Sequence, residues 1–178
     1  MNRSRLHVAH TANLTTEDLA AARVLIFEVS DDANEDDWEH CLGGMHAIIW
    51  EGDRMIAHGS VIQRRLIYRG RPLRTGYVEG VAVRADRRRR GHGAAVMAEL
   101  ERVIRGAYEL GALSSSEDGI PFYIARGWKR WQGLTYALTP GGIIRTPEDD
   151  DGVFLLPVSE SLDLSADLTC DFRPGDLW

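Results

Sequence analysis

Three consecutive strand-like runs in the first half of the chain restrict the possible folds more than any other feature. They span residues 46–50, 55–68 and 73–84 and are rich in β-branched and aromatic side chains. Glu51 to Arg54 and Arg69 to Pro72 separate them, and both separators contain a glycine. Strands joined by such short turns pair antiparallel, so this region predicts a meander within one sheet.

Helical patterns lie on both sides of this meander. Thr15, followed by acidic residues, is typical of a helix start, and the helix that follows should end near Val29. Apolar residues recur at helical spacing within residues 94–110, which predicts a second long helix. We expect short helices at residues 35–41 and 117–126, the latter capped by Ser116, and short strands at 6–9, 110–113, 128–131, 134–138 and 153–156.

This order of elements predicts the fold class. Strand, helices, three antiparallel strands, helix, strand, helix and strands give an α+β (mixed α/β) fold, with helices packed on a mostly antiparallel sheet. A length of 178 residues fits a single domain spanning residues 1–178, with a tail at residues 146–178.

Composition and charge exclude several classes of protein. Hydrophobic residues make up 44% and charged residues 27%, as in ordinary globular proteins, and the formal net charge of -6 disfavours nucleic-acid binding. No apolar run approaches the roughly 18 residues of a membrane helix, and the start of the chain lacks a signal-like apolar region, so we expect a cytoplasmic protein. We expect Cys41 and Cys170 to be free and buried, with no metal site.

A glycine- and arginine-rich loop, Arg88 to Ala94, follows the third strand and opens the long helix. Glycines let the backbone approach a ligand closely, and a helix N-terminus offers unpaired N–H groups and partial positive charge. The loop therefore predicts a pyrophosphate site. It is neither a Walker loop nor a dinucleotide fingerprint, and a solvated basic turn is the alternative. RNA binding is disfavoured because the chain is acidic overall and no aromatic stacking pattern accompanies the arginines.

Acidic residues form three clusters in the sequence. The first is Asp31, Asp32, Glu35, Asp36 and Asp37, the second is Glu148 to Asp151, and the third is Asp171, Asp176 and the carboxylate of Trp178. Each cluster alone is also explained by a solvated loop. Together with the basic loop they predict a protein that binds a polyanion at one site and a cationic partner at another.

Taken with its flanks, the basic loop resembles the signature of the GNAT acetyltransferase superfamily. It reads Arg88-x-x-Gly91-x-Gly93 after the strand Gly76 to Val83, and Pro121 to Trp128 is similar to the superfamily's Phe-Tyr-x-x-x-Gly-Phe segment. The resemblance covers about residues 5–140. It implies helices on both faces of a central sheet that is split between its central strands for coenzyme A.

Other segments resemble the aminoglycoside 2′-N-acetyltransferases across nearly the whole chain. They are Asp37 to His46, Val61 to Arg64, Gly76 to Glu79, Leu110 to Ser114 and Cys170 to Trp178. This resemblance implies acetyl-CoA as the donor, the 2′-amino group of an aminoglycoside as the acceptor, drug resistance as the outcome, and a homodimer.

The resemblance also implies two catalytic residues. Glu79 removes a proton from the acceptor ammonium, through ordered water, because an ammonium cannot attack the thioester. Tyr123 protonates the departing thiolate, at modest cost if its pKa is near the ordinary value of about 10. The alternatives are a solvent-facing glutamate and a packing tyrosine. Neither cysteine has the setting of a nucleophile, which favours direct transfer.

The binding residues are likewise implied by the resemblance. Coenzyme A should contact the backbone of the strand end and the loop, at Val81, Ala82, Val83, Arg88, Arg89, Arg90, Gly91, His92 and Gly93. A bulge just before Val81 would let the acetyl group in. The acceptor should contact Asp32, Asp37, Glu79, Gly80, Ser114, Glu148, Asp149, Asp176 and Trp178, where Glu148 departs from the aspartate usual in the family. The tail should complete the acceptor site, so an extension beyond Trp178 should be damaging.

Two other functions remain open from the sequence. One is acetylation of a different amine, such as a polyamine, a cell-wall amino sugar or a protein N-terminus. The other is a non-catalytic module that binds coenzyme A.

Overall fold

The computed structural model describes residues 4–159 and 161–178, and the chain divides into two compact units. Unit 1 contains residues 1–62 and 78–103, and unit 2 contains residues 63–77 and 104–178. Two long strands, β3 (Arg54–Tyr68) and β4 (Arg71–Val83), contribute to both units. Residues 1–3, part of the segment that we expect to lack a signal, lie outside the described residues.

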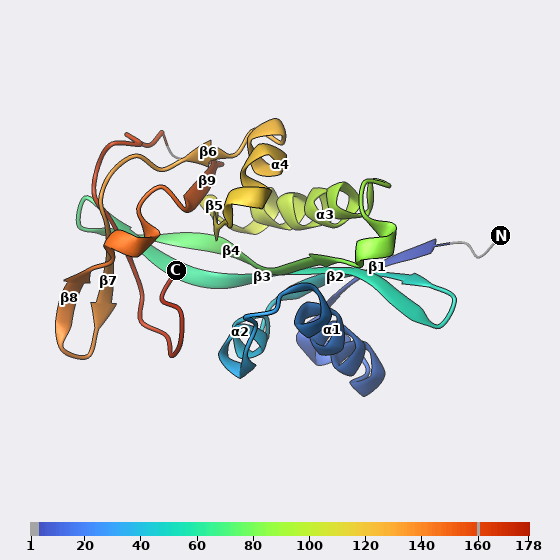
Figure 1. Cartoon of the computed structure of the whole chain (residues 1–178). Helices are drawn as coiled ribbons and strands as arrows, with labels where there is room; N and C mark the ends of the chain where they lie inside the picture. Colours follow the sequence, from blue (N-terminus) through green and yellow to red (C-terminus); the bar gives the residue numbers. More distant parts are fainter. Residues whose placement is uncertain (1–3, 160) are drawn as a thin grey trace. The chain divides into compact units, whose positions relative to one another are not determined.

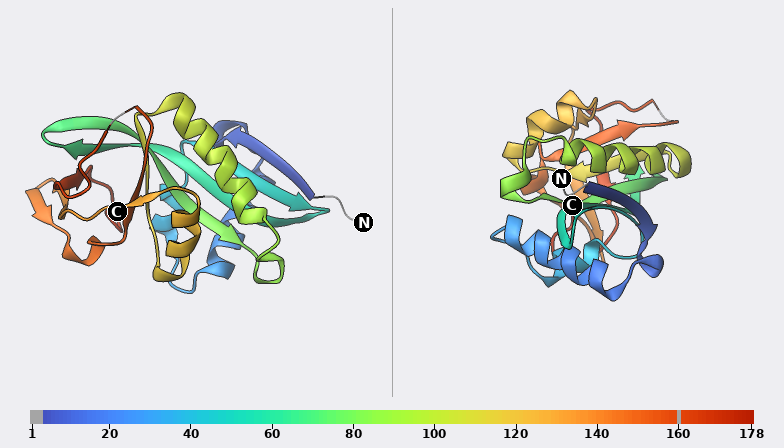
Figure 2. Two further views of the ribbon diagram at one scale, coloured as in Figure 1. Left: turned by 90° about the horizontal axis from the view of Figure 1, so that it is seen from above. Right: turned by 90° about the vertical axis from the view of Figure 1, so that its right-hand side faces the viewer.

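Unit 1 contains the N-terminal strands and three helices. Its elements are β1 (Ser4–His10), η1 (Thr11–Asn13), α1 (Thr16–Val29), α2 (Glu35–His40), β2 (Met45–Glu51), the first part of β3, the last part of β4, η2 (Ala85–Arg87) and most of α3 (His92–Ala107). β1 pairs antiparallel with β2, and β2 pairs antiparallel with β3, which neighbours β4. β1 is therefore the outer strand of this unit (Figure 2).

The helices of unit 1 cover both faces of its strands. A Cβ atom at Gly80 of β4 would meet side chains of the α1–α2 side, whereas one at Gly59 of β3 would meet Val96 and Leu100 of α3. α1 and α2 lie on one side of β2 and β3, and α3 lies on the other (Figure 1). The expectation of helices on both faces is confirmed here.

Local sequence explains the start of α1. Thr15 caps the helix, because its hydroxyl accepts from the Asp18 N–H at 3.0 Å while Asp18 accepts from the Thr15 N–H at 3.1 Å. This reciprocal capping box satisfies two backbone donors that a helix start otherwise leaves unpaired. The predicted start and the predicted end at Val29 are both confirmed.

The turn between β3 and β4 sets the register of the long hairpin. Arg69 and Gly70 both have positive φ, 48° and 77°, as a type I′ turn requires. A two-residue turn of this kind matches the twist of antiparallel strands. The predicted meander is thus confirmed.

Unit 2 contains the remaining strands. Its own elements are β5 (Leu110–Ser114), η3 (Glu117–Gly119), α4 (Ile120–Ala125), β6 (Lys129–Arg130), β7 (Thr135–Thr139), β8 (Gly142–Arg145), η4 (Pro147–Asp149), β9 (Val153–Pro157) and β10 (Leu168–Cys170). With β3 and β4 the order is β6-β9-β5-β4-β3-β10-β7-β8. Among the strand pairings whose register the structure describes, β4–β5 and β10–β7 are parallel and the others are antiparallel, so the mostly antiparallel sheet predicted from the sequence is confirmed.

Several boundaries differ from the sequence predictions. The long helix begins at His92 and ends at Ala107 rather than spanning residues 94–110. Leu110 begins β5 instead, where it pairs with Thr75 of β4. The predicted helix at 117–126 divides into η3 and α4, and the Ser116 side chain caps neither. β8 and β10 were not predicted, and because β10 lies within residues 146–178, the description of that tail with one strand was incomplete.

Two further predictions concern the cysteines and the membrane. Cys41 and Cys170 are both free and buried, as predicted. Among the described residues, the structure contains no helix of the length and apolar character that membrane crossing requires.

Candidate functional site

The end of β4 and the start of α3 form one continuous structure in unit 1. Arg88 turns back and its Nε donates to the Val83 carbonyl at 3.2 Å. Arg89 and Gly91 adopt positive φ values of 57° and 85°, so the loop bends sharply before α3 begins at His92. Positive φ favours glycine, which explains why Gly91 stands at this position.

This loop has the features of an anion site. The first backbone N–H groups of a helix as long as α3 have no intrahelical partner, and they carry partial positive charge. Arg89 and Arg90 are exposed beside them. The residues present therefore fit a pyrophosphate, and the backbone of Arg88 to Gly93 could hold one in the conformation that it has in this structure.

Val81, Ala82 and Val83 form the last part of β4. The described ladder between β4 and β5 has three pairs and ends at Tyr77 and Ala112, so it does not extend to Val81. On the other side the strand end is fixed to β3, where the Arg84 N–H donates to the Ile56 carbonyl at 3.0 Å. This arrangement suits a strand segment that offers its second edge to a ligand.

Glu79 and Gly80 lie directly before this segment. Glu79 is half-buried, and Gly80 has a φ of 57°, which interrupts the extended backbone of β4 as glycine does at a bulge. A Cβ atom at Gly80 would lie 2.6 Å from the Cys41 sulfur and 3.0 Å from Ile26 Cδ1. A side chain at this position would meet these atoms, and the positive φ is itself unfavourable for other residues, so both observations explain glycine beside Glu79.

The α2 region is packed against Gly80 through Cys41. The Cys41 sulfhydryl donates to the Asp37 carbonyl at 3.3 Å, and the Asp37 carboxylate accepts from the Asn34 N–H at 2.8 Å as part of a helix cap. Asp37 is half-buried and Asp32 is exposed in the turn between α1 and α2. Unit 1 thus brings Asp37 near Gly80, whereas Asp32 stands in solvent.

Tyr123 lies on α4 in unit 2 within an aromatic group. Its ring centroid is 5.2 Å from that of Phe122, 6.2 Å from Trp128 and 6.5 Å from Phe154. Burial raises the pKa of Tyr123 to about 12, with Arg126 acting weakly in the opposite direction. The expectation of a pKa near the ordinary value was therefore wrong, because the phenol lies among aromatic rings that solvate its anion poorly.

The second acidic cluster gathers at η4. Asp149 is half-buried, and burial, together with the nearby charges of Glu148 and Asp176, raises its pKa to about 6. Ser114 ends β5 beside this turn, since a Cβ atom at Gly152 would contact both the Ser114 hydroxyl and the Asp149 carbonyl. Four of the predicted acceptor residues are thus brought together around one turn of unit 2.

Trp178, the fifth acceptor residue in unit 2, is anchored at the same turn. Its indole is buried and Nε1 donates to the Thr146 hydroxyl at 3.0 Å, directly before η4. Arg173 donates to the Trp178 main-chain oxygen at 2.9 Å, and Arg64 donates to the Leu177 carbonyl at 2.7 Å. The end of the chain therefore has a fixed position beside Asp149.

Two carboxylates of the acidic clusters have structural partners instead. Asp150 accepts from Arg145 at 2.6 Å and from Thr135, and the pKa of Asp150 is strongly lowered by this pairing. Asp171 accepts from Arg64 at 2.8 Å and from the Arg65 N–H at 3.0 Å. Both carboxylates thus bind protein partners, and neither is among the predicted acceptor contacts.

Comparison with known proteins identifies the family. A model of the acetyltransferase (GNAT) domain matches residues 13–131. This chain belongs to the GNAT acetyltransferases. The matched region contains β4, the basic loop, α3 and the aromatic segment around Tyr123.

A close relative and two solved structures extend this comparison. The chain is 51% identical, over 97% of its own length and 93% of the relative's, to an aminoglycoside 2′-N-acetyltransferase of Mycolicibacterium fortuitum. A GNAT family acetyltransferase of Brucella melitensis, solved in complex with acetyl-CoA, has a TM-score of 0.61 at 14% identity, with 92% of this chain and 94% of that chain covered.

The second structure is a probable N-acyltransferase of Enterococcus faecalis. It has a TM-score of 0.61 at 14% identity over 74% of this chain. This chain spans only about a third of that protein, 34% of its length. At these identities the two structures show the fold alone, and they agree with the GNAT architecture described above.

Sequence reasoning missed two arginines of unit 2 that hold the segment ending in Trp178. Arg64 is 3% exposed and its guanidinium lies 4.7 Å from the centre of the Tyr77 ring, while that of Arg173 lies 5.4 Å from the same ring. A signal existed for Arg64, because it stands on the buried side of β3 between exposed Gln63 and Arg65. An arginine at an inward-facing strand position requires a carboxylate or carbonyl partner.

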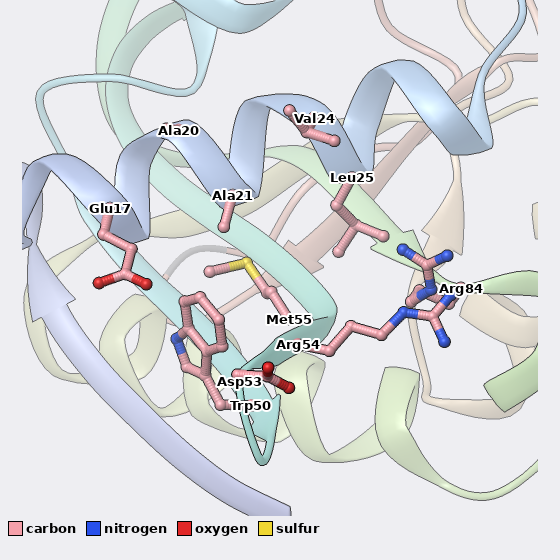
Figure 3. Close-up of a pocket in the computed structure, with 10 residues that line it drawn as sticks. All are labelled: Glu17, Ala20, Ala21, Val24, Leu25, Trp50, Asp53, Arg54, Met55 and Arg84. Carbon is pink, nitrogen blue, oxygen red and sulfur yellow. The ribbon is translucent and has the colours of Figure 1, made fainter.

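A hollow in unit 1 contains none of the predicted site residues. It has a volume of about 350 Å³ and lies between α1 and the β2–β3 turn. Leu25 lines it from α1 and Trp50 and Met55 line it from β2 and β3, while Arg54 and Arg84 stand at one end (Figure 3).

Proposed function

We propose that this GNAT acetyltransferase moves the acetyl group of acetyl-CoA to the 2′-amino group of aminoglycosides, and thereby confers resistance to them. One observation carries the substrate: the 51% identity to an aminoglycoside 2′-N-acetyltransferase over nearly the full length of both chains. The acidic turn around Asp149 supports the same acceptor class, since its crowded carboxylates gain stability from a polycation.

For the donor, we propose that Arg88 to Gly93 bind the pyrophosphate and that Val81 to Val83 bind the pantetheine arm. The bound donor supplies an activated acetyl thioester. The positive φ of Gly91, the unpaired N–H groups at the start of α3 and the ladder of β5 that stops before Val81 support these roles. Because the reaction consumes acetyl-CoA, we propose a cytoplasmic location.

We propose that Glu79 is the general base and that its backbone neighbour Gly80 contacts the acceptor. An amine is mostly protonated near neutral pH, so a carboxylate that attracts the ammonium and takes its proton, directly or through water, prepares it for attack. Asp32 and Asp37 in unit 1, and Ser114, Glu148, Asp149, Asp176 and Trp178 in unit 2, are the proposed contacts to the remaining ammonium and hydroxyl groups.

Tyr123 is the residue that we propose to stabilise the departing thiolate. A pKa of about 12 keeps the phenol protonated at neutral pH. Complete transfer of its proton to a thiolate of pKa about 8.5 would cost about 5 kcal/mol in this environment. We therefore propose that Tyr123 donates a hydrogen bond to the leaving sulfur and gives up its proton only as the pocket rearranges around the ligand.

Direct transfer without a covalent intermediate is the mechanism that we propose. Both cysteines are buried, and burial raises the pKa of Cys170 to about 11, which suppresses the thiolate. The Cys41 sulfhydryl already donates to the Asp37 carbonyl. Neither thiol has the surroundings of an activated nucleophile.

A substrate screen tests the proposal. Thiol release from acetyl-CoA should be fast with aminoglycosides that carry a 2′-amino group and slow with spermidine, glucosamine and a peptide N-terminus. Glu79→Gln and Tyr123→Phe should lower kcat by about 10²–10⁴-fold while coenzyme A still binds. Turnover of spermidine with no turnover of aminoglycosides would favour a polyamine acceptor, and full activity of both variants would remove the assigned catalytic roles.

We propose in addition that the enzyme is a homodimer and that the edge strand β8 belongs to its subunit contact. Ile143 is 61% exposed and Ile144 46%, and both lie on an outer strand of unit 2 next to exposed Leu138. An exposed apolar edge strand is a place where strands of another chain pair.

Ile143→Asp should give a monomer by light scattering, whereas Val24→Asp, at a comparably exposed position on α1, should not. A monomeric unmodified protein would contradict this assignment.

A further inference from the structure

Two histidines of unit 1 are completely buried next to each other. His46 on β2 and His58 on β3 have no exposed surface, and their ring centres are 5.3 Å apart. A buried imidazole is kept only where its nitrogen atoms have partners. The partners of these two rings connect them to the strand that carries Glu79.

A chain of short hydrogen bonds runs through both rings. The Thr11 hydroxyl lies 2.8 Å from His46 Nε2, His46 Nδ1 lies 3.0 Å from His58 Nε2, and His58 Nδ1 lies 2.7 Å from the Gly80 carbonyl. This chain of hydrogen bonds therefore begins at η1, directly after β1, and ends at Gly80 of β4.

Chemistry determines the direction of every bond in this chain. The Gly80 carbonyl can only accept, so His58 carries its proton on Nδ1. Burial lowers the pKa of His58 to about 4 and that of His46 to about 3, so both rings are neutral. His58 Nε2 then accepts from His46 Nδ1–H, which leaves His46 Nε2 as an acceptor for the Thr11 hydroxyl at 2.8 Å; the same hydroxyl also lies 3.3 Å from the Gly44 carbonyl.

Gly80 depends on this partner. Its φ of 57° takes the peptide out of the regular strand, and its carbonyl points to His58. The packing of Gly80 against the Cys41 sulfur leaves no room for an alternative side chain. A partly buried carbonyl without a donor is unfavourable, so we expect loss of the His58 N–H to release the backbone at Gly80 from this conformation.

We propose that His58, held in its tautomer by His46, is a positioning residue for Glu79. A bulge re-aims the side chains beside it, so the hydrogen bond that fixes Gly80 also fixes the direction of the neighbouring Glu79 carboxylate. His58 acts through Glu79 and touches no reacting atom. The proposal rests on the function proposed above for Glu79.

The kinetic test uses substitutions that separate the donor from the bulk of the ring. His58→Leu removes the Nδ1–H and should lower kcat for aminoglycosides at least tenfold, while KM for acetyl-CoA stays within twofold because residues 88–93 are unaffected. His58→Asn places an amide N–H close to the position of Nδ1 and should restore most of the activity. His7→Leu, at an exposed histidine of β1, is the matched control and should behave like the unmodified enzyme.

A double substitution distinguishes positioning from a general structural role. In the Glu79→Gln background, His58→Leu should cause no further loss of kcat, because the group that it positions is already gone. An equal loss in both backgrounds would overturn the proposal, as would an active His58→Leu enzyme. If the unmodified enzyme fails to acetylate aminoglycosides, the proposed function fails instead.

Nuclear magnetic resonance of the unmodified protein gives a readout that does not depend on activity or on a variant that folds. Long-range proton–nitrogen spectra of the histidine rings should show two neutral imidazoles protonated at Nδ1. The His58 Nδ1–H should exchange slowly with solvent. Nε2-protonated rings at these positions, or a charged ring at pH 6, would contradict the proposed chain.

Discussion

The charged form of Asp149 is destabilised by its surroundings. Burial and the charges of Glu148 and Asp176 raise its pKa to about 6, whereas the adjacent Asp150 is fully paired with Arg145. The sequence shows four consecutive acidic residues and offers no means of separating them, because the difference arises from contacts of Arg145 and Thr135 made on folding. A cationic ligand near this turn would reduce the repulsion at Asp149, whereas Asp150 is already neutralised by Arg145.

Aminoglycoside binding should therefore depend on pH through Asp149. Below pH 6 the carboxyl group is mostly protonated and attracts no ammonium, and as pH rises through 6 the carboxylate forms, so affinity should increase. We expect about a fivefold tighter Kd at pH 7 than at pH 5, which corresponds to a binding-linked lowering of the Asp149 pKa by about one unit from about 6. Calorimetry should also detect proton release near pH 6.

The control for this prediction is Asp149→Asn. Its affinity should be lower at pH 7 and nearly constant from pH 5 to 7. A variant with the same pH dependence as the unmodified protein would assign the titration to another group.

Asp171 should matter for stability rather than for binding. It is the carboxylate partner of Arg64, which is 3% exposed and also holds the Leu177 carbonyl. Asp171→Ala leaves a buried guanidinium without its counter-charge, and we expect a loss of about 2–3 kcal/mol, below the usual 3–5 for fully buried pairs because Asp171 is partly exposed. Urea denaturation measures this loss. An unchanged midpoint would show that the pair does not stabilise the fold.

At the scale of elements, the sequence predicts a boundary correctly where contacts between neighbours in sequence determine it. The capping box at Thr15 and the Arg69–Gly70 turn involve neighbours in sequence, and the predicted boundaries there were accurate. β10 has three residues and exists because it pairs with Leu66 to Tyr68 and with β7. Such a strand is created by distant contacts, so no periodicity within residues 168–170 could reveal it.

The loop before α3 allows a matched pair of glycine substitutions. Gly91 has a φ of 85°, so Gly91→Ala should destabilise the protein by about 1–2 kcal/mol and weaken coenzyme A binding. Gly106 lies within the same helix with open space around it, so Gly106→Ala should stabilise by about 0.5–1 kcal/mol and leave coenzyme A binding unchanged. Thermal unfolding and a coenzyme A titration test both. Equal effects of the two substitutions on binding would argue against the loop as the pyrophosphate site.

At the scale of the whole molecule, the proposed chemistry is divided between two units. Unit 1 contains the basic loop, the strand end, Glu79 and the histidine chain, and unit 2 contains Tyr123, the turn with Asp149 and the anchored Trp178. The sequence predicted the α+β architecture and the GNAT family from signatures that are contiguous in the chain. It missed Arg64 and the histidine pair, because their importance depends on burial and on partners up to 113 residues away.

The position of the acetyl group on the product is the most direct measurement of the central claim. Tobramycin, incubated with the enzyme and acetyl-CoA and then assigned by mass spectrometry and NMR, should carry one acetyl group on its 2′ nitrogen. Kanamycin A, which has a hydroxyl at that position, should bind without being acetylated. Acetylation of tobramycin at another amine, or of kanamycin A at a comparable rate, would contradict the account.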